Sequence, residues 1–398
     1  MADYQVIDTP DGLAAAAGSI ASGAGPVAVD AERASGFRYS QRAYLIQVYR
    51  RGAGTFLFDP PPIGDFAPLQ DAIGDEEWIL HAASQDLACL REVGLDPVRI
   101  FDTELGARLL GRPKVGLAAV VEDLLGITLA KEHSAADWST RPIPQSWLQY
   151  AALDVEHLVD VRERMGDELD AADKRAIAEE EFRAVLEREA KPAPAEPWRR
   201  LSGIHGVRGQ RALAIARALW TARDEYARET DIAPGRLVPD AAIVAVAKSL
   251  PESKRALAEL RTFTGRASRT EIDRWWAAIE EGRTTQDLPA VRVPADTLPP
   301  VRAWSSRNPE ADARLKPARR ALTEVAESMG MPVENLLTPD YLRRVAWSPP
   351  EPATAVSIAS ALADLGARPW QVDATAQRIA DAFVEAAQAD DVGVTTGS

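Results

Sequence analysis

The sequence predicts an α/β domain at the N-terminus followed by all-α domains, and three observations support this. Short apolar runs alternate with helical patterns through residues 1–190, which is typical of a mixed sheet flanked by helices. A proline-rich linker at 191–197 then interrupts regular structure. Beyond it, apolar residues recur at three- and four-residue spacing, which indicates helices. A chain of 398 residues is long enough for two to four domains.

Three strands are expected early in the chain, at 26–30, 43–49 and 55–58, because these runs are rich in Val, Leu, Ile and aromatic residues. Their connections are too short for a parallel crossover, so most of these strands should pair antiparallel. The sheet is expected to contain five to six strands. The later elements of this domain are a helix at 65–72, a strand at 78–81, a helix at 84–93, a strand at 99–102, and then helices to residue 190.

Two helical domains are expected after the linker. The first spans 198–282, and its apolar spacing predicts four helices. A second proline-containing linker covers 283–310, and another helical unit follows at 311–389. Residues 390–398 are polar and terminal, which is typical of a disordered tail. The four helices of the first unit are expected at 208–230, 239–248, 253–262 and 268–280.

The charge of the chain is unevenly distributed. Its formal net charge of −14 argues at first against nucleic acid, because phosphate contacts need clustered Lys and Arg. Residues 1–190 carry −15, residues 198–280 carry +5, and residues 281–398 carry −4. A basic segment therefore lies between two acidic ones, and it is where nucleic acid should bind.

A cytoplasmic protein without a nucleotide cofactor is expected. The single cysteine, Cys89, excludes an intrachain disulfide and any cysteine-based zinc cluster. The first residues lack the pattern of a signal peptide, and no long apolar run predicts contact with a membrane. Neither the phosphate-binding loop of ATPases nor the glycine pattern of dinucleotide-binding folds occurs.

Carboxylates occupy unusual places in the N-terminal domain. Asp30 and Glu32 stand at the end of an apolar strand and, two residues apart, project to the same face. Asp86 follows another apolar strand, in the first turn of the next helix, where it could simply complement the helix dipole with Ser84 as N-cap. Each acid taken alone is compatible with an ordinary surface role.

Tyr150 and Asp154 are four residues apart in a helical pattern, so they share one face of the helix. A phenol next to a carboxylate can hold a water molecule, although a surface pair is equally compatible. Together with Asp30, Glu32 and Asp86, they suit metal-assisted phosphodiester hydrolysis, in which two Mg²⁺ or Mn²⁺ ions are held by carboxylate oxygens. A tyrosine could orient the attacking water.

These residues resemble the three sequence motifs of the DEDD 3′–5′ exonucleases, in the subclass whose third motif is Tyr-x-x-x-Asp, and most closely the ribonuclease D family. The resemblance implies a ribonuclease H-like exonuclease fold. It also implies that four carboxylates ligate the metal ions and that the tyrosine positions the nucleophilic water. The chain departs from many relatives at Arg33, where they carry an aromatic residue. The motifs are Asp30-Ala-Glu32, Leu80 to Asp86, and Tyr150 to Asp154.

The segment from Trp198 to Ile243 is similar to the HRDC domain, a helical nucleic-acid-binding module, and 311–389 resembles a second, degenerate copy. The local charge of +5 supports a basic surface in the first of these. The expected phosphate contacts, which could also be ordinary solvated charges, are Arg199, Arg200, Arg208 and Arg211.

The resemblance implies a metal-dependent 3′–5′ exoribonuclease that trims RNA with a free 3′ end, such as transfer-RNA precursors, and releases nucleoside 5′-monophosphates. A DNA exonuclease is the first alternative, because the same motifs serve enzymes that act on DNA. The second is a non-catalytic RNA-binding protein on the same scaffold. The intact set of four acids and Tyr150 argues against that alternative.

Overall fold

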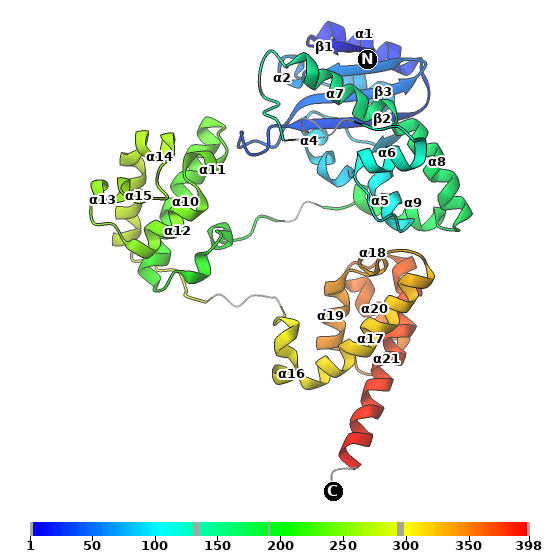
Figure 1. Cartoon of the computed structure of the whole chain (residues 1–398), viewed down its shortest axis with the longest axis vertical. Coiled ribbons are helices and arrows are strands. Elements are labelled where there is room, and N and C mark those ends of the chain that lie inside the picture. The colour runs from blue at the N-terminus through cyan, green and yellow to red at the C-terminus, as the bar shows by residue number, and fades with distance from the viewer. Residues whose placement is uncertain (1–2, 130–134, 190–191, 293–297, 396–398) are drawn as a thin grey trace.

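The computed structural model describes the backbone of residues 3–129, 135–189, 192–292 and 298–395. Figure 1 shows a part that contains the sheet and two separate helical parts, which follow one another along the chain. From the resemblances described above, we refer to these parts as the catalytic domain (residues 3–186), the HRDC unit (residues 197–292) and the C-terminal unit (residues 298–395). Among the described residues, no helix combines the length and apolar character needed to cross a membrane.

The catalytic domain is built on a six-stranded mixed sheet with the strand order β1-β4-β3-β2-β5-β6. β2, β3 and β4 pair antiparallel, whereas β1–β4, β2–β5 and β5–β6 pair parallel. The mixed sheet and its antiparallel centre are as the sequence predicts, but the edge strand β1 was not expected. The strands are β1 (Tyr4–Ile7), β2 (Ala24–Arg33), β3 (Ala43–Arg51), β4 (Gly54–Phe58), β5 (Glu77–Leu80) and β6 (Arg99–Asp102).

Strand β2 runs through the middle of the sheet. Its Val27, Ala28 and Val29 are buried, as expected for a strand covered on both faces. The strand continues past Asp30 because β3 pairs with it as far as residue 33. Asp30 and Glu32 therefore lie within a hydrogen-bonded strand and not in a turn beyond its end.

Helices cover the sheet of the catalytic domain (Figure 1). The helix expected at 84–93 is divided: a 3₁₀ turn at Ala83–Gln85 precedes α4, and Ala82 has a left-handed backbone with φ of 62°. The expectation that Ser84 caps the helix is wrong, because it lies inside this turn. The helices are α1 (Pro10–Ala21), α2 (Pro60–Ile63), α3 (Ala67–Ile73), α4 (Leu87–Glu92), α5 (Thr103–Leu109), α6 (Leu117–Leu125), α7 (Gln145–Glu156), α8 (Leu158–Ala171) and α9 (Arg175–Leu186).

The HRDC unit has its own hydrophobic core, which includes Trp198, Leu219 and Trp275. α10 and α15 pack side by side and carry much of this core. The expected helix at 268–280 is two helices, because the chain bends between Thr270 and Ile272. The helices are α10 (Gln210–Thr230), α11 (Pro234–Leu237), α12 (Asp240–Ser249), α13 (Lys254–Ala258), α14 (Arg266–Thr270) and α15 (Ile272–Thr284).

The C-terminal unit begins within the segment expected as a linker, because Trp304 of α16 is fully buried. Its last helix also continues past residue 389, where we expected the tail to begin, and reaches Thr395. Residues 396–398 of that expected tail, like residue 191 of the first linker, lie outside the described residues. The helices are α16 (Trp304–Arg307), α17 (Pro309–Ser328), α18 (Val333–Leu336), α19 (Pro339–Trp347), α20 (Ala355–Asp364) and α21 (Pro369–Thr395).

The C-terminal unit and the catalytic domain share one hydrophobic core cluster. At their contact, the buried Glu181 of α9 accepts hydrogen bonds from the Arg368 guanidinium and, at 2.8 Å, from Trp370 Nε1. Lys174 Nζ donates to the carbonyl oxygens of Leu109 and Gly330, which belong to the two different parts. These two parts therefore form a single packed body.

The HRDC unit meets the catalytic domain through the β2–β3 loop, residues 34–42. The Ala233 amide donates to the Phe37 carbonyl at 3.0 Å, and Asp231 accepts from the Ser40 amide at 2.8 Å. The Arg236 guanidinium lies over the Phe37 ring, 3.9 Å from its centre. This contact consists of hydrogen bonds, cation–π pairs and the packing of the Tyr39 ring against the HRDC core.

Candidate active site

A cavity of about 360 Å³ opens where strand β2, the turn after β5 and helix α7 meet. All five residues that the sequence predicted as catalytic line it, although they come from three separate stretches of the chain. The structure thus brings Asp30, Glu32, Asp86, Tyr150 and Asp154 together at one place.

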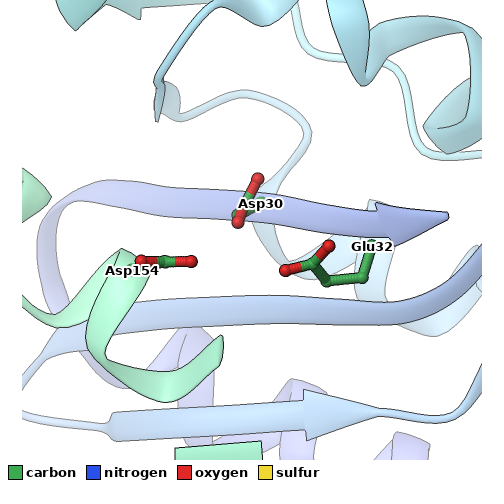
Figure 2. A group of neighbouring side chains, drawn as sticks. All are labelled: Asp30, Glu32 and Asp154. Carbon is green, nitrogen blue, oxygen red and sulfur yellow. The ribbon is translucent and has the colours of Figure 1, made fainter. Parts of the chain in front are cut away.

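Three of the carboxylates form a compact group. Asp30 and Glu32 come from β2 and Asp154 from α7, and one oxygen atom of each lies within 4.8 Å of the others. Figure 2 shows the strand and the helix presenting these side chains toward a common space. The alternating geometry of β2 places both of its acids on the face that α7 covers. Such spacing is suitable for ligands of a single cation.

Asp86 enters the cavity lining from the segment after β5, directly after the 3₁₀ turn. It occupies the N-cap position of α4, where an acid complements the helix dipole, but its side chain makes no capping hydrogen bond. One oxygen lies 3.9 Å from an Arg33 guanidinium nitrogen. Asp86 is only 6% exposed. Burying a carboxylate costs free energy unless the group is paired or coordinates a metal ion. A metal ion bound in the cavity would offset this cost for Asp86.

Asp102, at the end of β6, fixes the turn that carries Asp86. Its buried carboxylate accepts the backbone amides of Ala82 and Ala83 at 3.0 and 2.9 Å. It also caps α5 by accepting the Glu104 and Leu105 amides. Sequence reasoning missed this residue, although an Asp-Thr pair at a helix start is a recognisable N-cap signal.

The carboxyl groups of the cavity hold protons more tightly than ordinary ones. Burial is the main cause, and it raises the pKa of Asp30 to about 6 and those of Asp86 and Asp154 to about 8. Burial also raises the pKa of Glu32 to about 10, with the negative charges of its three acidic neighbours adding to the effect. The acids therefore repel one another unless positive charge enters the cavity.

The donor set fits a divalent metal ion. Carboxylate oxygens are hard ligands of the kind that Mg²⁺ and Mn²⁺ prefer. Among the described residues that line the cavity, Arg33 is the one that is cationic at neutral pH, since burial lowers the pKa of His81 to about 4. One guanidinium does not balance four carboxylates, so cations are the expected complement.

Tyr150 lies one helical turn before Asp154 on α7 and hydrogen bonds to its carboxylate. Burial and the nearby acids raise the pKa of the Tyr150 phenol, so it stays protonated at neutral pH. The phenol can therefore donate to a carboxylate and accept from water, but it is a poor base.

The four arginines proposed to contact phosphate have different surroundings. Arg199 and Arg208 line a cavity of about 810 Å³ in the HRDC unit together with His205 and Arg292. Arg200 is exposed outside this lining. Arg211 donates to the backbone carbonyls of Gly282 and Thr285, so it fastens the end of α15.

Three family models match the chain. The 3′–5′ exonuclease model covers residues 4–170, and the HRDC domain model covers residues 212–279. The third model, described as the 3′ to 5′ exonuclease C-terminal domain, covers residues 297–383.

Two of the similar proteins are described as ribonuclease D. Ribonuclease D of Escherichia coli K12 is 30% identical over 339 residues, which is 84% of this chain and 87% of that protein. The crystal structure of Escherichia coli RNase D, an exoribonuclease involved in structured RNA processing, is 26% identical with a TM-score of 0.70 and covers 96% of this chain and 99% of that one. A protein from Bifidobacterium adolescentis is 38% identical with a TM-score of 0.87, covering 96% and 100%. The chain therefore belongs to the ribonuclease D family of DEDD 3′–5′ exoribonucleases.

Proposed function

We propose that the cavity around Asp30 is the catalytic centre and that the protein removes nucleotides one at a time from the 3′ end of RNA, releasing nucleoside 5′-monophosphates. The observation that carries this is the convergence of four carboxylates, two of them buried and two half-buried, and one tyrosine in a single cavity. Its substrates would be RNAs with a free 3′ end, such as transfer-RNA precursors.

Four carboxylates would hold two divalent ions, Mg²⁺ or Mn²⁺. Asp30, Glu32 and Asp154 are close enough to share one ion, and Asp86 lines the same cavity and would help to hold the second. When bound, the ions supply Lewis acidity and neutralise charge on the phosphate. Binding also requires the carboxylates to lose the protons that burial favours.

Tyr150 would orient the attacking water. Its phenol is held by Asp154 and stays protonated, so we assign it a positioning role and no proton abstraction. A water molecule that donates to the phenol oxygen would be directed at the phosphorus of the last phosphodiester.

The first experiment is a time course with 5′-labelled RNA in Mg²⁺, Mn²⁺ or EDTA. A ladder of products that differ by one nucleotide, present with metal and absent with EDTA, is expected. The same digestion of DNA with the same sequence should be slower. Faster loss of the DNA would make the DNA exonuclease alternative correct, and activity in EDTA would contradict the metal-dependent mechanism.

Single substitutions test the assigned residues. Asp30→Asn should lower kcat/KM by about a thousandfold, which corresponds to about 4 kcal/mol of transition-state stabilisation. Tyr150→Phe should lower kcat by about a hundredfold without weakening metal binding measured by calorimetry. Asp167→Asn is the matched control, since this acid is exposed on α8 away from the cavity. Full activity of Asp30→Asn would show that the cavity is not the catalytic centre.

A further inference from the structure

A smaller cavity of about 200 Å³, which we call the arginine cavity, lies in the catalytic domain at the β2–β3 loop and the segment before α7. Three of its lining residues are arginines, in a domain whose net charge is strongly negative. Clustered guanidinium groups next to an acidic centre indicate a site for an anion. The lining consists of Arg38, Arg42, Tyr44, Pro61, Ser139 and Arg141.

Two segments of the chain contribute residues to the lining of both the arginine cavity and the catalytic cavity. On the β2–β3 loop, Ser35 lines the catalytic cavity, and Arg38, three residues later, lines the arginine cavity. On the segment before α7, Ala136 lines the catalytic cavity and Ser139 lines the arginine cavity. Three residues span at most about 11 Å, so the two cavities are neighbours.

The two segments are joined by a direct contact. The Arg38 Nε donates to Ser139 Oγ at 2.8 Å, and the Arg38 amide donates to the Ala34 carbonyl at 2.9 Å. The loop therefore turns back on itself and aims Arg38 at the segment that leads to α7. Among the described residues, no acceptor binds the remaining guanidinium nitrogens of Arg38.

The charges in the arginine cavity are only partly balanced. Arg141 forms a two-pronged ion pair with Asp59 at 2.6 and 2.8 Å. Arg42 lies 3.5 Å from Asp231 of the HRDC unit. Arg38 makes no ion pair with any carboxylate in the described part of the chain. One positive charge is therefore left over, which matches the single charge of a phosphodiester.

We propose that the arginine cavity binds a backbone phosphate of the RNA strand, upstream of the nucleotide that is being removed. Arg38 is the principal contact, because a guanidinium can donate two parallel hydrogen bonds to phosphate oxygens. Arg42 lines the same cavity, but its charge is already paired with Asp231. The assignment rests on the proposed function, since it takes the neighbouring cavity as the catalytic centre.

The test compares Arg38→Gln with the wild-type full-length protein on two RNAs. One is an oligonucleotide of about twelve residues, and the other is a dinucleotide, whose only phosphodiester is the scissile one. In EDTA, the dissociation constant of the longer RNA should rise by about tenfold, and the slope of log affinity against log salt should fall by about 0.7. In metal, dinucleotide turnover should stay within about twofold of wild type.

Two variants separate the proposed contact from a general loss of charge. Arg38→Lys should keep the wild-type salt slope and recover part of the affinity for the longer RNA. Lysine keeps the positive charge but cannot donate two parallel hydrogen bonds to one phosphate. Arg320→Gln, on the exposed face of α17, removes the same charge far from both cavities and should bind RNA like wild type.

Unchanged affinity of Arg38→Gln for the longer RNA would overturn the assignment. An equal loss of dinucleotide turnover would also overturn it, since Arg38 would then act at the catalytic centre. A wild-type protein that does not shorten RNA in metal would instead contradict the proposed function. The binding measurement in EDTA distinguishes these two failures.

Discussion

The two helical units are attached to the catalytic domain by different kinds of contact. The C-terminal unit shares a hydrophobic core with it and places a buried ion pair, Glu181 with Arg368, at the boundary. The HRDC unit keeps a core of its own and contacts the β2–β3 loop through partly buried polar groups, cation–π pairs and the ring of Tyr39, which packs against that core. Burial of apolar area provides more stability than exposed polar contacts do. The C-terminal unit is therefore part of the folded body, whereas the HRDC unit is a separable attachment.

The largest effect is expected at the shared core. Glu181→Ala should lower the free energy of unfolding by about 3 kcal/mol, because it leaves the Arg368 guanidinium without its carboxylate in a largely buried site. Urea unfolding at constant m-value measures this. Glu179→Ala, an exposed acid on the same helix, should change stability by less than about 0.5 kcal/mol. Equal losses of unfolding free energy in the two variants would show that the ion pair between Glu181 and Arg368 does not stabilise the attachment of the C-terminal unit.

The acidic cavity should cost the catalytic domain stability that the shared core offsets. Asp154→Asn removes one of the buried charges, so we expect the metal-free variant to be more stable than wild type by about 1–2 kcal/mol at pH 8. Thermal unfolding in EDTA measures the change. Added Mg²⁺ should raise the Tm of the wild type more than that of the variant. A metal-free variant that is less stable than wild type would contradict the idea that the carboxylates of the cavity repel one another.

The pH dependence follows from the same groups. In the folded state, burial raises the pKa of Asp86 and Asp154 from 3.8 to about 8, so between these values the folded protein binds more protons than the unfolded chain. Their contribution therefore makes the metal-free protein less stable as pH rises from about 4 to about 8. Metal affinity, measured by calorimetry, should rise over the same range, because the ions displace these protons. Affinity that does not change with pH would contradict the raised pKa values.

A smaller effect is expected at the HRDC contact. Asp231→Ala removes the acceptor of the Ser40 amide and of the Tyr44 hydroxyl, but the carboxylate is partly exposed. Global stability should fall by less than about 1 kcal/mol. Hydrogen exchange of the amides at 36–44 should nevertheless become faster, because the loop loses its anchor. A loss as large as that of Glu181→Ala would make the HRDC unit part of the folded body.

The smallest effect distinguishes two arginines of the HRDC unit. Arg208→Gln should leave stability unchanged and reduce the salt slope of RNA binding by about 0.7, as expected for one lost phosphate contact. Arg211→Gln should reduce stability and leave the slope unchanged, because Arg211 is bonded to the end of α15. A salt slope that is unchanged in Arg208→Gln and reduced in Arg211→Gln would show that the large cavity of the HRDC unit does not contact RNA.

Much of the catalytic domain could be predicted from local sequence. The strands at the centre of the sheet are apolar runs that end at clear turns, and the five residues at the candidate site follow such runs or share a helix face. Strand β1 was not predicted because Tyr4–Ile7 is a short edge strand whose middle residues are exposed. It therefore lacks the apolar run that marks an inner strand.

Contacts between distant segments could not be predicted. The apolar faces of the C-terminal helices indicate that they are buried, but such a face does not identify the surface that buries it. The role of Asp102 was missed for a similar reason, since its bonds to Ala82 and Ala83 depend on the parallel pairing of β5 and β6. The arginine cavity joins two segments about a hundred residues apart, and only the fold brings them together.

The shared core also has a consequence for synthesis on the ribosome. Lys174 donates a hydrogen bond to the carbonyl oxygen of Gly330, and a Cβ atom at Gly111 would clash with that same oxygen. The catalytic domain is made first, yet part of its apolar surface is covered by helices that are translated last. A nascent chain that stops before α17 would leave this surface open to chaperones and proteases. Nuclease activity should therefore appear late, when almost the whole chain has been released.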